Sequence, residues 1–326
     1  MIARRFVLCA VIALGTAASM AGRAAAQAYP DRLIKMVVPF PAGGPIDITA
    51  RLLVRRLGPI LGQTVIIENR GGAGGALGSK AVASADPDGY TLLFGNASAL
   101  VVGPAVYRFR DYDTVKHFTP VAKVTEGYEV LVVAPDFPAR NVLELVAYSK
   151  AHPGELNFGS MGYGNLTHLA AEMFKLKTGT DFVHVPYKGS PEAVAGIVAG
   201  QVHMLFGEVA GLLPHVREGK IRALGMASAG RNALAPELPT MIEGGIPDFV
   251  ALTFTGVVAP AGTPASIVRK LNAAINEALA PVDMVAALGK LGAEVRPASA
   301  EDFGAFIAKE REKWVDVVTR TGIKAE

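Results

Sequence analysis

The sequence predicts an α/β protein with two lobes, and three observations support this prediction. Short apolar runs alternate with segments whose apolar residues recur at helical spacing, a pattern typical of a parallel sheet covered by helices. The chain has 326 residues, whereas a single domain usually has about 100–200. Hydrophobic residues make up 51% of the chain and the formal net charge is only +3. Such a chain can bury large cores and is not disordered.

The first lobe is predicted from strand and helix units in the N-terminal third of the chain. Strands are expected at residues 33–39, 64–68 and 91–95. A helix with Pro45 in its first turn is expected to end at Leu61, and a second helix is expected at residues 76–84.

A second set of units begins near Val130. The expected strands cover residues 130–134, 156–160, 182–185, 202–206 and 223–227, and the expected helices cover residues 142–151, 166–178 and 191–199. The C-terminal part adds a strand at 255–259 and a helix from Pro264 capped by Thr263. A last helix begins with a capping box of Ser299 and Asp302. No linker separates the two sets, so we expect the chain to cross between the lobes more than once.

Residues 1–26 are predicted to be a secretory signal peptide. Two arginines precede an apolar stretch that is too short to span a membrane, and small residues before position 27 match a cleavage site. Cleavage would remove Arg4, Arg5 and Arg23 and no acidic residue, leaving 29 basic and 29 acidic residues. It would also remove Cys9, the only cysteine, so no disulfide is expected. A neutral mature chain gives no electrostatic reason to bind nucleic acid.

Motifs for metal, nucleotide or catalytic sites are incomplete. The six histidines form no closely spaced ligand pair, so we predict no metal site. Residues 71–78 are rich in glycine but match no phosphate-binding spacing, and they are best explained as a turn before a helix. Ser160 lies in a sequence similar to a nucleophile elbow, but Phe158 stands where that motif requires glycine. We therefore predict no cofactor and no enzymatic activity.

The candidate binding elements are two glycine loops, each between a strand and a helix, one in each expected lobe. The first spans residues 40–47, and the second spans residues 160–165 and leads to His168. Glycine lets a ligand approach the backbone, and free N–H groups at a helix start attract an anion. Two such loops that face each other across a cleft would grip a small carboxylate. Each loop taken alone can also be an ordinary tight connection.

Other residues near these loops have both a functional and a structural interpretation. Asp47 can hold the loop amides or accept a hydrogen bond from a ligand, and it also suits the start of a helix. His168 and Tyr187 can line the cleft or pack locally. Glu208 can point into the cleft or be an exposed loop charge, and Phe254 is more consistent with the core than with a cleft wall.

At these residues the sequence resembles the Bug or TctC family, the periplasmic solute receptors of tripartite tricarboxylate transporters. The matching motifs occur in the same order over nearly all of the expected mature chain. They are Tyr29-Pro30, Val38-Pro39-Phe40-Pro41-Ala42-Gly43-Gly44-Pro45 with Asp47, Glu68-Asn69-Arg70 before Gly74-Gly75, Asp88-Gly89-Tyr90-Thr91-Leu92-Leu93, His168-Leu169-Ala170, Pro186-Tyr187-Lys188-Gly189 and Ala259-Pro260-Ala261-Gly262-Thr263-Pro264.

The resemblance implies a type II periplasmic binding-protein fold, in which two α/β lobes close over a ligand and crossover strands act as a hinge. It implies a first lobe of residues 27–125 and 228–326 and a second lobe of residues 126–227. It also implies that backbone amides of the glycine loops, with bridging waters, hold a carboxylate. The residues of this site would be Phe40, Ala42, Gly43, Gly44, Asp47, Asn96, Ala97, Ser98, Ser160, Gly162, Gly164, Asn165, His168, Tyr187 and Glu208.

Three positions depart from the pattern of this family. The loop after the third strand reads Asn96-Ala97-Ser98-Ala99, where the family is commonly rich in Ser, Thr and His. Glu208 follows Gly207 where many members have Asp, and Phe254 stands near a position often occupied by Trp. These differences indicate a less polar or bulkier carboxylate, with aromatic acids among the candidates.

The expected protein is a non-enzymatic, monomeric receptor in the periplasm that delivers a small organic carboxylate to integral membrane subunits of a transporter. Two alternatives remain open. The same fold and pocket would serve a ligand-sensing adaptor of a membrane signalling protein. A secreted serine hydrolase built on Ser160 with His168 or His184 is the less favoured alternative.

Overall fold

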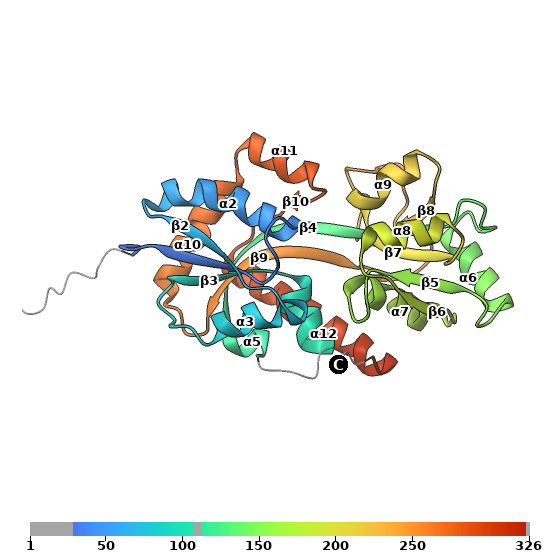
Figure 1. Ribbon diagram of the computed structural model, residues 1–326, viewed down its shortest axis with the longest axis horizontal. Coiled ribbons are helices and arrows are strands. Elements are labelled where there is room, and N and C mark those ends of the chain that lie inside the picture. Colours follow the sequence, from blue (N-terminus) through green and yellow to red (C-terminus); the bar gives the residue numbers. More distant parts are fainter. Residues whose placement is uncertain (1–28, 107–111, 324–326) are drawn as a thin grey trace, which may run out of the picture.

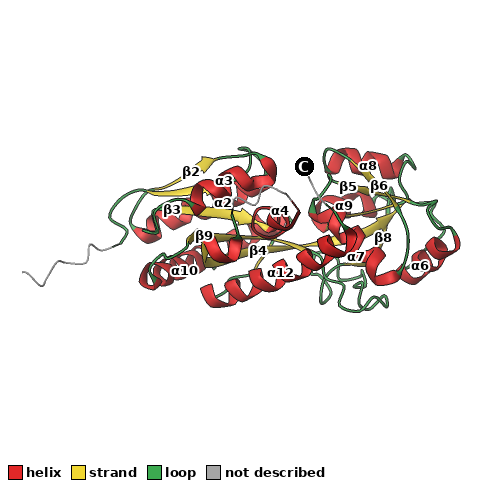
Figure 2. Cartoon of the chain, turned by 90° about the horizontal axis from the view of Figure 1, so that it is seen from below, coloured by secondary structure: helices red, strands yellow, loops and turns green. Residues whose placement is uncertain are grey.

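The computed structural model describes residues 29–106 and 112–323, which form two α/β lobes (Figure 1). The lobes lie side by side along the long axis of the molecule, and long strands run between them (Figures 1 and 2). The two-lobed α/β architecture predicted from the sequence is confirmed. The predicted signal peptide lies outside the described residues. No helix in the described part of the chain combines the length and hydrophobicity that a membrane span requires.

The first lobe is built on strands in the order β2, β1, β3, β9 and the first part of β4. Their bounds are Ile34–Val38 for β1, Val65–Asn69 for β2, Thr91–Asn96 for β3, Phe118–Val133 for β4 and Leu252–Pro260 for β9. β1 pairs in parallel with β2 and β3, whereas β9 is antiparallel to both β3 and β4. A short strand, β10 (Glu294–Val295), pairs with β4. The parallel pairing expected from the alternation is present in β1, β2 and β3, but the sheet as a whole is mixed, because the strands that cross between the lobes run against their neighbours.

Helices cover the faces of this sheet. They are α2 (Pro45–Leu61), α3 (Ala76–Ala83), α4 (Gly103–Val106), α5 (Thr114–His117), α10 (Ala265–Leu279) and α11 (Val282–Lys290), with a 3-10 turn at Ala73–Gly75 and a π-helical turn at Ser98–Val102. Leu53 and Leu57 of α2 and Leu271 and Ile275 of α10 are buried in one core. Their burial explains the helical spacing of apolar residues in these segments.

The second lobe has the same alternation of strands and helices. Its elements are α6 (Val142–Ala151), β5 (Asn157–Ser160), α7 (Leu166–Thr178), β6 (Val183–Pro186), α8 (Ser190–Val198), β7 (Met204–Glu208), α9 (Val209–Arg217) and β8 (Arg222–Met226). β5 is parallel to β6 and β7, while β7 and β8 are antiparallel to β4. Phe174, Phe206 and Phe249 form an aromatic cluster in its core.

One strand, β4, belongs to both lobes (Figure 1). Residues 118–128 pair with β9 in the first lobe, and residues 129–133 pair with β7 in the second. The sequence predicted only the apolar end of this strand, because Pro120, Glu126 and Glu129 interrupt the hydrophobic pattern before it. A single strand of 16 residues therefore joins the lobes.

The segment before β9 is bonded to the second lobe. The amide of Met241 donates to the carbonyl oxygen of Met226 (2.7 Å), and Gly245 lies against Leu143 of α6. The amide of Ala251 donates to the carbonyl oxygen of Ala227 (2.9 Å) just before β9 begins. We propose that residues 228–251 belong to the second lobe, so that the second crossing lies at the start of β9.

The C-terminal helix α12 (Ala300–Thr321) contacts both lobes. Phe303 fills the space above Gly256 of β9, where a Cβ atom would lie 2.2 Å from the ring. The ammonium of Lys313 donates to the carbonyl oxygen of Val250 (3.0 Å), and the neighbouring Trp314 is fully buried. The helix also lies against α7 of the second lobe (Figure 2). It therefore braces one side of the junction between the lobes.

The two predicted helix caps have different outcomes. The hydroxyl of Ser299 accepts from the amide of Asp302 (3.0 Å), so the predicted cap of α12 is confirmed. The Asp302 carboxylate accepts from the Ser299 hydroxyl (2.8 Å) and not from its backbone amide, so the bond that would complete a capping box differs. The prediction that Thr263 caps α10 is wrong. Its hydroxyl donates to the carbonyl oxygen of Pro260 (2.7 Å), because the helix begins later and Pro264 is the residue that precedes it.

The lobes also touch where Gly292, between α11 and β10, lies against Ala210 at the start of α9. A Cβ atom on Gly292 would lie 1.9 Å from the Cβ of Ala210. Nearby, the side-chain amide of Asn232 donates to the carboxylate of Glu294 in β10 (2.7 Å). This second side of the junction is therefore closely packed.

We expect Gly292→Ala to destabilise the protein more than Gly219→Ala. Both glycines are left-handed, with φ of 75° and 71°, so alanine costs about 1–2 kcal/mol at either position. Nothing lies within 4 Å of a Cβ at Gly219, whereas the overlap with Ala210 should add roughly 1–3 kcal/mol. Thermal melts of the two variants measure this difference, and equal losses would contradict the contact between the lobes.

Candidate functional site

The carboxyl ends of the parallel strands of the two lobes face each other at the junction. β3 runs in the same direction as β4 because both are antiparallel to β9, so β3 ends toward the second lobe. β7 is antiparallel to β4 and parallel to β5, so β5 and β7 end toward the first lobe. Loops that follow the carboxyl ends of strands are where open α/β sheets bind ligands.

The predicted site residues are all placed at these strand ends. The segment after β1 contains Phe40, Ala42, Gly43, Gly44 and Asp47, and the end of β3 contains Asn96, Ala97 and Ser98. The end of β5, with the loop and helix that follow it, contains Ser160, Gly162, Gly164, Asn165 and His168. Tyr187 follows β6, and Glu208 ends β7. Residues that are far apart in the sequence therefore border one junction.

The loop between β1 and α2 is held by the carboxylate of Asp47, which is 1% exposed. Its Oδ2 accepts from the amide of Gly43 (2.9 Å) and from Nε of Arg51 (2.7 Å), and its Oδ1 accepts from the side-chain amide of Asn69 (2.9 Å). The pKa of Asp47 is lowered to about 2, chiefly by the hydrogen bond from Arg51, which outweighs the rise that burial alone would cause. The side chain therefore stays ionised and fixes the loop.

The carboxylate of Asp47 binds one of the amides that were expected to bind a ligand. Gly43 has φ of 83°, the left-handed region that favours glycine, and its amide is bound to Asp47. Asn69 ties the same cluster to the start of the loop, because its amide also donates to the carbonyl oxygen of Phe40 (3.1 Å). The amides of Ala42 and Gly44 are therefore the candidate donors of this loop.

The loop after β3 is also internally bonded. The side-chain oxygen of Asn96 accepts from the amide of Ala99 (3.0 Å), and Ala97 is buried. In the sheet Asn96 is paired with Thr255 of β9, whose hydroxyl is hydrogen-bonded to that of Thr125 in β4 (2.6 Å). The crossing strands β4 and β9 thus supply two hydroxyl groups beside the loop after β3, which has few polar side chains. The sequence analysis did not single out either threonine.

The loop between β5 and α7 is held by bonds to its own helix. The amide of Gly164 donates to Nδ1 of His168 (3.0 Å). The side chain of Asn165 accepts from the amide of Thr167 (2.7 Å) and caps α7. Gly162 has φ of 128°, which a side chain would strain. The loop is therefore a fixed frame around a helix N-terminus.

Four rings lie in a row beside this loop in the order Phe158, His184, His168 and Tyr163; the first three are stacked, and the ring of Tyr163 is tilted by 51° against that of His168. The distances between successive ring centroids are 4.7, 3.8 and 4.8 Å. Burial, as the largest cause, lowers the pKa of His168 to about 3 and that of His184 to about 4. Both imidazoles are therefore neutral at neutral pH. Tyr163, at the end of the stack, is 50% exposed.

Ser160 is fully buried, and its hydroxyl contacts Nε2 of His184 (2.6 Å) and the carbonyl oxygen of Gly162 (3.1 Å). A hydroxyl has only one proton to donate. When that proton goes to Gly162, His184 must donate to Ser160 and does not act as its base. No carboxylate among the described residues orients His184, as a nucleophile pair would require. These bonds position the loop and do not favour the hydrolase alternative.

Two residues considered as cleft walls have rings with close contacts inside the protein. The ring of Tyr187 lies against Gly196 of α8, and its hydroxyl donates to Gln201 (3.3 Å). The backbone of Tyr187 lies beside the second loop, since its amide donates to the carbonyl oxygen of Ser160 (3.0 Å). Phe254 is buried edge-on against Phe303, as expected of a core residue.

A carboxyl pair that the sequence analysis missed lies where β4 crosses the junction. Glu129 of β4 is directly opposite Glu208 of β7 in the antiparallel register. Glu129 is 2% exposed and its Oε2 has no hydrogen-bond partner, whereas Glu208 is exposed to solvent. Burial, and then the charge of Glu208, raise the pKa of Glu129 well above its ordinary value. Desolvation by the surrounding protein also raises the pKa of Glu208, although the residue is partly open to solvent.

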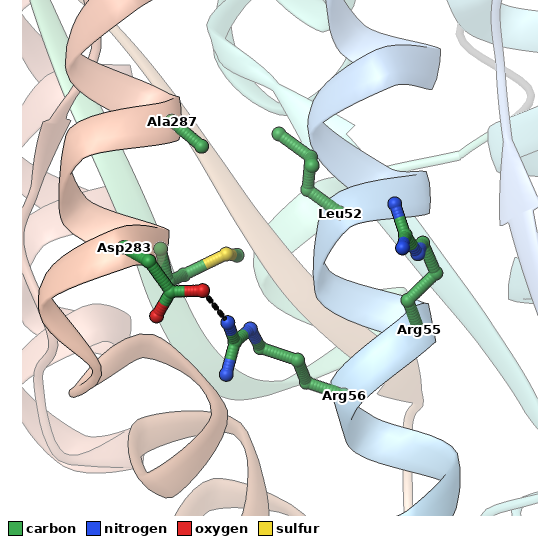
Figure 3. Close-up of a pocket in the computed structure, with 6 residues that line it drawn as sticks. Leu52, Arg55, Arg56, Asp283 and Ala287 are labelled. Carbon is green, nitrogen blue, oxygen red and sulfur yellow. Dashed lines mark hydrogen bonds and ion pairs between the residues drawn. The ribbon is translucent and has the colours of Figure 1, made fainter.

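A separate pocket of about 330 Å³ lies between α2 and α11 (Figure 3). Its lining residues are Leu52, Arg55, Arg56, Asp283, Met284 and Ala287. Arg56 forms an ion pair with Asp283 across it. None of the predicted site residues lines this pocket, so it is distinct from the junction.

Two α/β lobes joined by crossing strands, with strand-end loops meeting between them, define a two-lobed solute-binding protein. The chain belongs to the family described as the tripartite tricarboxylate transporter family receptor, whose model matches residues 49–323. It is 40% identical to protein BugT of Bordetella pertussis over 319 residues, which are 97% of this chain and 98% of BugT. The family resemblance found in the sequence is confirmed.

Solved structures of similar proteins share this fold. MatC from Rhodopseudomonas palustris, solved with bound malate, is 36% identical, with a TM-score of 0.73 over 89% of this chain and 100% of MatC. A second protein from R. palustris, solved with adipate, is 33% identical, with a TM-score of 0.76 over 91% of this chain and 99% of that protein. The predicted periplasmic binding-protein fold is confirmed.

We expect Asp47→Asn to lower the free energy of unfolding by about 1.5–3 kcal/mol, since it removes charge-assisted bonds to a buried carboxylate. Asp283→Asn, in the exposed pair with Arg56, is the matched control and should cost less than about 1 kcal/mol. The pKa of Asp47 is lowered, so its stabilisation is present above its ordinary pKa of 3.8 and is lost as pH falls toward about 2. The difference between wild type and Asp47→Asn in denaturant unfolding should therefore shrink from pH 4 to 2. A difference that stays constant over this range would contradict the role of the charge.

We expect Glu129→Gln to stabilise the protein, and increasingly so as pH rises. The pKa of Glu129 is higher in the folded state than in the unfolded chain. Above the ordinary carboxyl pKa, the unfolded chain therefore releases this proton more readily, and the free energy of unfolding falls as pH rises toward the pKa of the folded state. Melting temperatures from pH 5 to 8 measure the effect. Glu126→Gln on the same strand is the control with the opposite sign, because Glu126 accepts from Lys123 (2.6 Å) and Tyr128 (2.8 Å). Destabilisation by both variants at pH 8 would show that Glu129 has a stabilising partner.

Proposed function

We propose that this protein is an extracytoplasmic solute receptor that binds a small organic carboxylate between its lobes and delivers it to a membrane transporter of the tripartite tricarboxylate type. The observation that carries the proposal is the position of the two glycine loops, one from each lobe, at the facing strand ends. Family membership supports the transport role, and the malate and adipate bound to relatives support the ligand class.

The carboxylate would accept hydrogen bonds from backbone amides at the starts of α2 and α7. Gly44 and Asn165 are the residues that precede these helices, and helix N-termini favour an anion. Asp47 and His168 act indirectly, because they hold Gly43 and Gly164 in place. The mature chain is expected to be neutral, so attraction for an anion comes from these local donors.

Closure of the lobes is the mechanical step of the proposed function. A ligand that contacts both lobes binds the closed arrangement more tightly than the open one and shifts the population toward it. Bending would occur where β4 passes between the lobes and where the chain enters β9. We propose that the receptor works as a monomer in the periplasm, without a cofactor, after removal of residues 1–26.

A ligand-sensing adaptor for a membrane signalling protein remains the second candidate, because it would use the same fold and pocket. Recovery of membrane proteins with the ligand-loaded receptor distinguishes the two roles. Transporter subunits would support delivery, and a membrane kinase would support sensing.

We expect a thermal-shift screen of mono-, di- and tricarboxylates to identify stabilising ligands. A ligand present at 100 times its Kd should add about 2.7 kcal/mol to the free energy of unfolding. The protein is first unfolded and refolded to remove any bound ligand. If no carboxylate raises the melting temperature of this ligand-free protein, the proposed function is wrong. The compounds that bind should remain chemically unchanged with wild type and with Ser160→Ala, whereas turnover by wild type alone would support a hydrolase.

A further inference from the structure

The pocket between α2 and α11 continues beyond Arg55. The pocket itself has a volume of about 330 Å³, and Arg55 also lines a second hollow of about 590 Å³. The second hollow is formed by the last turns of α2, the turn that follows and the start of β2. β2 stands at one end of the strand order, so it is an edge of the sheet. The two hollows meet at Arg55 and form one groove over the surface of the first lobe, the α2–α11 groove.

The two helices beside this groove carry an excess of positive charge. α2 has three arginines and one aspartate, and α11 has one lysine and one aspartate, so four basic side chains stand against two acidic ones. Both aspartates already bind arginines. Arg55 and Lys290 are exposed, and their side chains make no hydrogen bond or ion pair with the residues that the structure describes. The groove therefore has two positive charges that the described part of the chain does not balance.

The groove also has an apolar floor. Asp283, Ala287 and Lys290 follow one another at helical spacing and share one face of α11. Met284 is buried at the bottom of the pocket, and Leu52 of α2 lies half-buried on the other side (Figure 3). Apolar residues with a charged rim are typical of a surface that another protein covers. The complementary surface combines apolar side chains with acidic ones.

An acidic protein segment fits the groove better than other anionic partners do. A small solute needs only about 300–1,000 Å³, so it would occupy one hollow and make no use of their continuity. A second copy of this chain in a two-fold dimer would bring Arg55 to the same contact as its own counterpart, where like charges repel. An anionic membrane is too flat to fill the hollows, and it would meet the carboxylate of Asp283, whose side chain is 74% exposed.

Both helices of the groove are connected to the cleft. α2 begins directly after Gly44 of the first glycine loop. α11 is followed by Gly292, which lies against Ala210 of the second lobe. A segment bound in the groove therefore contacts the helix that starts at the candidate anion site and the helix that leads to the contact between the lobes.

We propose that the α2–α11 groove is the surface through which this receptor docks onto an acidic segment of an integral membrane protein. The inference rests on the proposed function, which requires the receptor to meet a membrane partner. Arg55 and Lys290 bind the acidic side chains of the segment, and the floor of the groove receives its apolar ones.

Site-directed crosslinking tests this proposal. The expected mature chain has no cysteine, because Cys9 lies in the predicted signal peptide, so Ala287→Cys introduces a single thiol in the groove. Val115→Cys is the matched control, since Val115 is 55% exposed on α5 at the opposite side of the same lobe (Figure 1). Each variant is isolated without unfolding, labelled with a thiol-specific benzophenone and irradiated with membrane vesicles from the organism that encodes it. Mass spectrometry identifies the crosslinked peptides.

We expect Ala287→Cys to give at least about 5-fold more product than Val115→Cys, with the crosslink in an acidic segment of an integral membrane protein. In the Ala287→Cys background, Arg55→Glu should lower the yield at least about 5-fold, and Arg55→Lys should retain most of it. Arg269→Glu is the control for charge, because Arg269 of α10 is also exposed and without an ion pair to the described residues; it should leave the yield unchanged. These exposed substitutions should each change the free energy of unfolding by less than about 0.5 kcal/mol, which thermal melts check.

Four results would overturn the proposal. They are a yield from Ala287→Cys no higher than from Val115→Cys, a yield that Arg55→Glu leaves unchanged, a product that joins two receptor chains, and a crosslink only to soluble proteins. Sedimentation with protein-free phosphatidylglycerol vesicles is the test for lipid. If the receptor binds these vesicles through Arg55 and gives no membrane-protein product, the groove binds lipid and the proposal is wrong.

The failure of this inference is distinguishable from the failure of the proposed function. If carboxylates stabilise the receptor but the groove gives no specific crosslink, the docking surface is wrong and the carboxylate receptor stands. If the groove crosslinks to a membrane protein but no carboxylate binds, the docking surface stands and the carboxylate receptor is wrong. A crosslink to a membrane kinase would keep the docking surface and favour the sensing role.

Discussion

The continuity of β4 is the constraint on which the rest of the architecture depends. One strand of 16 residues pairs with β9 in the first lobe and with β7 and β8 in the second. Its hydrogen bonds fix the directions of its neighbours, so the carboxyl ends of β3 and β7 must face each other. The same strand places Thr125 and Glu129, two polar residues, between the lobes. The position of the site is therefore a consequence of strand pairing, and the loops add its chemistry.

The two glycine loops are fixed in different ways. On the first lobe an ionised carboxylate, Asp47, binds the Gly43 amide and is balanced by Arg51. On the second lobe a neutral imidazole, His168, accepts from the Gly164 amide inside a stack of rings. Neither arrangement places an unbalanced charge beside the loop amides. The amides that remain can therefore attract a carboxylate.

Local sequence patterns were sufficient for most helices and for the position of the loops. The helix at residues 166–178 was predicted with its observed bounds, because its apolar spacing and the Asn165 cap are local signals. Features that depend on pairing between distant segments were not predictable in the same way. The first part of β4 lacks an apolar run, and its strand conformation is stabilised by β9, which lies more than a hundred residues later. The partnership of Glu129 with Glu208 and the stacking of His184 on His168 likewise depend on sheet register. Tyr187 was expected to line the cleft, but whether its ring turns toward the cleft or toward α8 is decided by the space that Gly196 leaves.

A crystal structure with the carboxylate that binds most tightly in solution tests most directly whether the junction is the binding site. We expect a carboxylate oxygen at about 2.7–3.2 Å from a backbone amide of residues 42–44, and another within the same distance of an amide of residues 160–165. The lobes should be closer together than in the ligand-free crystal. A ligand bound in the pocket between α2 and α11, or held by one lobe alone with the lobes unmoved, would contradict this interpretation of the structure.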